Sequence, residues 1–118
     1  MNQIIAALQG AFFANEGAFL LQLRCDLIWS KQAFERLIQS MQAHLESERD
    51  KENIERWVAE GFWYLSHFVK DWTSHEDFPK PFASNYYESA YERLYDLSYR
   101  LFFGEPPYES GSLDPFNA

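Results

Sequence analysis

The sequence has few of the features that mark the common classes of small functional domain. It contains one cysteine, Cys25, so it cannot form an internal disulfide and is not a disulfide-stapled secreted scaffold. We expect Cys25 to be a buried, inert thiol, because it lies in an apolar stretch. A reducing compartment suits such a chain, and we expect a cytoplasmic protein.

Basic residues are also scarce. There are 10 Lys and Arg against 18 Asp and Glu, which gives a formal net charge of −8. Such a chain repels phosphate backbones, so direct binding of nucleic acid is disfavoured. The charge could steer the protein toward a basic protein partner, although most acidic domains carry such charge for solubility.

The sequence also lacks a long hydrophobic run. The N-terminal stretch "MNQIIAALQGAFFANEG" has no basic residue and is interrupted by Asn15 and Glu16 well before the roughly 20 apolar residues that a membrane span requires. We therefore predict neither a signal peptide nor a membrane anchor.

Motifs for metals, cofactors and catalysis are absent. The three histidines and one cysteine follow no metal-ligand spacing, and the five glycines are dispersed, so no phosphate-binding loop is present. The stretch "SHED", residues 74–77, reads more simply as a turn ahead of two prolines than as a cation site. We predict no metal and no cofactor. An enzyme remains possible only if a site is assembled by the fold.

What the chain has is apolar and aromatic residues, at 47% and 19% of the sequence, enough to enclose one core in 118 residues. Helical periodicity predicts helices over 31–47, 53–72 and 85–103, and a shorter one within the first dozen residues. We predict an all-α fold, a small up-and-down bundle of about four helices. Residues 1–104 would form this domain, and the Pro- and Gly-bearing residues 105–118 an irregular acidic tail.

Residues 13–29 are ambiguous. Leu21, Leu23, Cys25 and Leu27 alternate with polar residues as in a strand, which would place a β-hairpin before the helix at 31. The same stretch also prolongs the helical stripe of residues 31–47. We favour one long helix over 18–47, because a lone hairpin would lack a sheet partner.

The aromatic segment "GFWYLSHFVKDW", residues 61–72, divides between two faces of its helix. At about 100° per residue, the predicted core face lies within about 60° of Leu65. Its members are Val58, Gly61, Phe62, Phe68, Val69 and Trp72. Trp63 falls on the opposite side with His67, Glu60 and Arg56, and Tyr64 lies at the boundary.

Two interpretations of Trp63 compete. The one we favour covers Trp63 with the N-terminal segment or with residues 73–83, where Phe78 and Phe82 would build a second, smaller core. The other leaves Trp63 exposed as an anchor for a partner, with His67, Glu60 and Arg56 around it, because Trp and Arg dominate interface energetics. A slot for a small apolar ligand or pigment between aromatic helices is a further alternative.

From these observations we expect a non-enzymatic protein-binding module, such as an inhibitor, an immunity-type protein or an adaptor. We expect its partner to be a protein, a basic one if charge selects it, and the alternative of a homo-oligomer stays open. The partner-binding residues would be Trp63, His67, Glu60 and Arg56.

Overall fold

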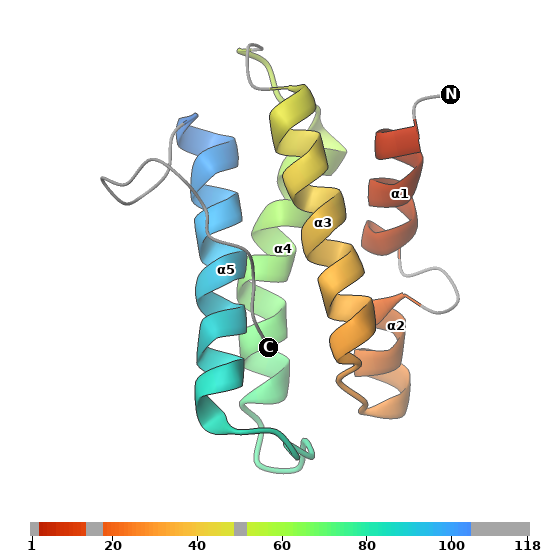
Figure 1. The fold of residues 1–118 in the computed structure, drawn as a ribbon, viewed down its shortest axis with the longest axis vertical. Helices are drawn as coiled ribbons and strands as arrows, with labels where there is room; N and C mark the ends of the chain where they lie inside the picture. The colour runs from red at the N-terminus through yellow and green to blue at the C-terminus, as the bar shows by residue number, and fades with distance from the viewer. Residues whose placement is uncertain (1–2, 14–17, 49–51, 105–118) are drawn as a thin grey trace.

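The computed structural model of the chain describes residues 3–13, 18–48 and 52–104, and all its regular elements there are helices. The elements are α1 (Gln3–Phe12), α2 (Phe19–Leu21), the π-helix η1 (Gln22–Asp26), α3 (Lys31–Ser47), α4 (Arg56–Thr73) and α5 (Ser84–Phe103). Successive long helices run in opposite directions, and α5 packs against both α3 and α4, while α1 packs against α3 (Figure 1). The predicted all-α bundle is confirmed. The predicted tail, residues 105–118, lies outside the described residues.

The bounds of the three long helices agree with the sequence within a few positions. Ser30 caps the start of α3, because its Oγ accepts a hydrogen bond from the backbone N–H of Ala33 at 3.1 Å. Helix α5 begins at Ser84, directly after Ala83, and has no side-chain cap. Gly104, with φ of 76°, ends α5 in the left-handed conformation that glycine adopts readily.

The prediction of one helix over 18–47 is wrong, and so is the hairpin. The short helical segment α2–η1 ends at Leu27, whose φ of 54° is left-handed, and residues 28–30 are not helical. In one straight helix Phe19 and Phe34 would stand about 22 Å apart, at about 1.5 Å per residue. The break folds α2 back on α3 and brings their ring centroids to 5.1 Å. Burial of these aromatic rings is the gain that offsets the strained backbone at Leu27.

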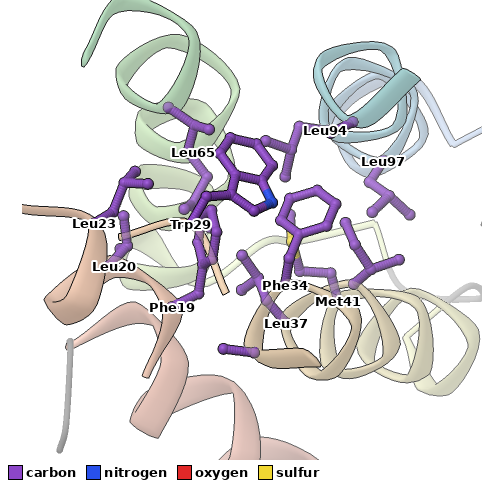
Figure 2. Packing of buried hydrophobic residues seen from close by; sticks show 14 of the residues in the cluster. Phe19, Leu20, Leu23, Trp29, Phe34, Leu37, Met41, Leu65, Leu94 and Leu97 are labelled. Atoms are coloured by element: carbon purple, nitrogen blue, oxygen red, sulfur yellow. The ribbon is translucent and has the colours of Figure 1, made fainter. Parts of the chain in front are cut away.

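Trp29, just before α3, fills the centre of the core. Its indole packs among side chains from several helices, with Leu65 of α4 and Leu94 of α5 facing it (Figure 2). Its Nε1 donates a hydrogen bond to the hydroxyl of Tyr86 at 2.8 Å, so the polar atom of the buried indole is satisfied. The periodicity of the sequence did not mark Trp29 as core, because it lies between two helices.

Residues 74–83, between α4 and α5, pack on the bundle through two phenylalanines. Phe78 is buried in the main core, and Phe82 packs against Tyr86 and Tyr87. The Lys31 ammonium lies 4.2 Å from the ring centroid of Phe82 and 4.5 Å from that of Tyr86. These cation–π contacts join the start of α3 to the start of α5. Phe78 is therefore part of the main core, and Phe82 packs at its edge.

Trp72, a predicted core position, is corrected, and further positions depart from simple helical phase. Trp72 and Ile54 are each 38% exposed. On α5 the side chain of Asp96 is only 7% exposed although it is charged, and Arg93, three residues earlier, is 9% exposed. The angular position of a residue on its helix does not by itself determine its burial, because burial depends on which other segments pack against that face.

Gly61 is the point of a close approach between α1 and α4. A Cβ built there would stand 2.1 Å from a carbon of the Phe12 ring of α1. The ring of Phe12 also packs edge-on against Phe62 and Trp57 of α4. Gly61 therefore opens the space through which α1 contacts α4.

No helix in the described ranges combines the length and the apolar character that a membrane span needs.

Candidate functional site

The α4 surface around Trp63 faces away from the core. Along α4 the buried side chains are those of Val58, Phe62, Leu65, Val69 and Thr73. Trp63 is 56% exposed, so the second buried layer that we favoured for it is wrong. The two phenylalanines proposed to cover it pack elsewhere, as described above.

Trp63 and His67 form a stacked pair on this surface. Their ring centroids are 4.3 Å apart and their planes are inclined by 26°. The two residues are one helical turn apart, which is the spacing that brings side chains into contact along a helix. The two stacked rings are exposed to solvent and restrict each other's orientation.

The orientation of His67 is fixed by the backbone of the same turn. Its Nδ1 lies 2.8 Å from the carbonyl oxygen of Trp63 and 3.0 Å from Oγ of Ser66, and that hydroxyl itself donates to the Trp63 carbonyl at 2.8 Å. We assign the proton of the neutral ring to Nδ1, because a carbonyl oxygen only accepts. Nε2 is then the nitrogen that can accept a hydrogen bond from an incoming group.

Arg56 and Glu60 lie on the same surface, at successive turns before the stacked pair. Both side chains are exposed. Neither has an ion-pair partner among the described residues. Both charges therefore remain available at the edge of the aromatic surface.

A row of three aromatic residues flanks this surface, and sequence reasoning missed it. Tyr64, Phe68 and Trp72 occur at every fourth position, with ring centroids 4.9 Å and 5.5 Å apart along the row. Tyr64 and Trp72 are 37% and 38% exposed. The spacing of four was the available signal, but Phe68 and Trp72 were read as core because they lie near the phase of Leu65.

The segment before α3 supports the far end of this row. The indole Nε1 of Trp72 donates to the backbone carbonyl of Leu23 at 2.9 Å. The guanidinium carbon of Arg24 lies 5.9 Å from the Phe68 ring centroid, within range of a cation–π interaction. Phe68 and Trp72 of the row therefore contact the segment that precedes α3.

Cys25, expected to be buried, is exposed on η1. In the described ranges no three His, Cys, Asp or Glu side chains gather into a possible metal site. The space between the helices around Trp29 is filled by the chain's own aromatic and aliphatic side chains (Figure 2).

Comparison of the chain with protein-family models, with curated proteins and with solved structures gives no match.

Proposed function

We propose that this protein is a non-enzymatic protein-binding module of the inhibitor, immunity or adaptor type. The contact surface is the outer face of α4, with Trp63 and His67 at its centre, Glu60 and Arg56 at its edge and Tyr64 beside them. The observation that carries the proposal is that Trp63 is 56% exposed while its ring is stacked on a histidine fixed by the backbone.

Such a pair is well suited to bind a protein. Tryptophan is among the residues that contribute most to binding energy when a partner covers them. Because stacking already restricts the ring, less side-chain entropy is lost when a partner orders it. The charged side chains at the edge would form the polar rim that surrounds such anchors.

The chemistry of the surface favours a basic partner. Nε2 of His67 accepts a hydrogen bond, which the side chain of Lys or Arg can donate. The net charge of −8 would also raise the rate of encounter with a positively charged protein. We place this activity in the cytoplasm, consistent with the single cysteine, and we do not propose direct contact with nucleic acid.

Site-specific photo-crosslinking in the native cell tests the proposal. A photoreactive phenylalanine derivative at Tyr64, beside Trp63, should capture a protein partner, and the same group at Gln39, exposed on α3, should not. Adding Trp63→Ala to the Tyr64 probe should abolish the product, since truncation of an anchor of this kind weakens binding by about 2 kcal/mol or more.

Each other outcome contradicts part of the proposal. Equal crosslinking from positions 64 and 39, or a product that is insensitive to Trp63→Ala, would exclude this surface. A crosslinked product that contains only this chain would identify a homo-oligomer in place of a separate partner. Binding that does not weaken with added salt would exclude a partner selected by charge.

A further inference from the structure

The outer side of α5 carries a second strip, in which all side chains except the half-buried Tyr99 are exposed. Leu94 and Leu97 point from α5 into the core (Figure 2). At about 100° per residue, five side chains between positions 88 and 102 fall within an arc of about 80° turned away from them. These are Glu88, Glu92, Tyr95, Tyr99 and Phe102, which we call the outer strip of α5.

The C-terminal half of the outer strip is aromatic. Tyr95 is 57% exposed and Phe102 is 45% exposed. Tyr99 lies between Tyr95 and Phe103, with ring centroids at 6.2 Å and 4.4 Å, and Phe103 is itself 66% exposed. Large aromatic side chains exposed in series mark surfaces that another molecule covers.

The N-terminal half of the outer strip is acidic. Glu88 and Glu92 are exposed. The basic residues of α5 are Arg93 and Arg100, which lie on another flank of the helix, and Arg93 is buried. No cation of α5 therefore neutralises the two glutamates on the outer strip.

We infer that the outer strip binds a basic amphipathic helix. Its residues are spaced 4, 3, 4 and 3 positions apart, the spacing of the seam along which two helices pack in a coiled coil. Apolar side chains of the incoming helix would cover Tyr95, Tyr99 and Phe102, and its Lys or Arg would pair with Glu88 and Glu92. The strip spans about 21 Å at about 1.5 Å per residue, so about four turns of the partner would suffice.

The charge of the strip argues against a second copy of the chain as the occupant. Two molecules that each carry a net charge of −8 repel one another. In an antiparallel pair the glutamates of one copy would lie against the aromatic rings of the other, and in a parallel pair they would face each other. A basic helix has neither difficulty. This inference does not depend on the proposal for Trp63.

A designed peptide provides the test. A labelled helical peptide of about 21 residues, with leucines along one half of its seam and lysines along the other, should bind the full chain in a fluorescence anisotropy titration. A matched peptide with glutamates in place of the seam lysines should bind at least about ten-fold more weakly. The double variant Glu88→Lys with Glu92→Lys should reverse this preference.

Two controls separate the strip from the rest of the molecule. Glu46→Lys with Glu76→Lys makes the same change of net charge at exposed positions outside α5, and should leave the preference unchanged. Trp63→Ala should also leave peptide binding unchanged. An equal loss of binding in both double variants would reduce the effect to overall charge and overturn the inference.

Three further results would overturn it. The first is no detectable binding of the lysine peptide. The second is a dimer in analytical ultracentrifugation that Tyr95→Ala dissociates, which would assign the strip to a second copy. The third is a ten-fold gain in peptide affinity on removal of residues 105–118, which would assign it to the chain's own C-terminal segment.

Discussion

Trp63 and Leu65 stand two positions apart on α4 and differ completely in environment. Leu65 is fully buried, whereas Trp63 is 56% exposed. We expect Leu65→Ala to lower the free energy of unfolding by about 2–5 kcal/mol, because it leaves a cavity in the core. Trp63→Ala should lower it by less than about 1 kcal/mol, because the substitution removes mainly a surface stack. Urea denaturation of the two variants measures the contrast, and equal losses would place Trp63 in a buried layer.

Ionisation of Tyr86 should make the free energy of unfolding depend on pH. Burial raises the pKa of Tyr86 from 10.0 to about 12, even though the hydrogen bond from Trp29 acts in the opposite direction. The unfolded chain therefore loses this proton at lower pH than the folded chain does. The contribution of Tyr86 to the free energy of unfolding is therefore fully present below pH 10 and falls as the pH rises toward 12. The total loss should be no more than about 2.7 kcal/mol. Urea denaturation at several pH values measures this loss.

Tyr86→Phe should have two effects. At pH 7 it should lower the free energy of unfolding by about 1–3 kcal/mol, because the buried Nε1 of Trp29 loses its hydrogen-bond acceptor. Between pH 10 and 12 the variant should lose less stability than the parent chain, with the remaining slope due in part to Tyr87, whose pKa burial also raises. Tyr95→Phe, at an exposed hydroxyl, is the control and should change neither quantity. If the free energy of unfolding of Tyr86→Phe fell between pH 10 and 12 as steeply as that of the parent chain, Tyr86 would not be the cause of the loss.

At the scale of the element, the contact between α1 and α4 depends on Gly61. In an unhindered helix, Gly→Ala stabilises by about 1 kcal/mol. Here the new methyl group would stand 2.1 Å from the Phe12 ring, so we expect Gly61→Ala to destabilise the protein by about 1–3 kcal/mol. Thermal and urea denaturation measure the change.

Phe12→Ala supplies the matched background for this test. With the ring removed, Gly61→Ala should become stabilising by about 1 kcal/mol, because only helix propensity remains. The same loss in both backgrounds would mean that α1 does not contact α4 through this glycine.

For the whole molecule, the buried apolar core extends from Leu8 to Leu97 within the described part of the chain. The Pro-, Gly- and Ser-bearing composition of residues 105–118 contributes little to such a core. A chain that ends at Gly104 should therefore keep its melting temperature to within a few degrees, as measured by circular dichroism at 222 nm. A larger loss would indicate that Tyr108, Leu113 or Phe116 packs on the bundle.

The sequence by itself determined the helical class and the three long helices. Apolar side chains at helical spacing require a common buried face, and Ser30 and Gly104 supply the chemistry that begins α3 and ends α5. It also determined that Trp63 and His67 share the face opposite Leu65, because this follows from helical geometry alone.

Only the tertiary structure decided which faces are covered. Helical phase places Trp63 opposite the core, but whether another segment covers it depends on where Phe78 and Phe82 pack. The same holds for the break before α3: local spacing favoured one helix over 18–47, and the aromatic contacts of Phe19 with Trp29 and Phe34 favour the fold-back. These contacts join residues on different elements, and burial between elements outweighs the small free energies of local helix preference.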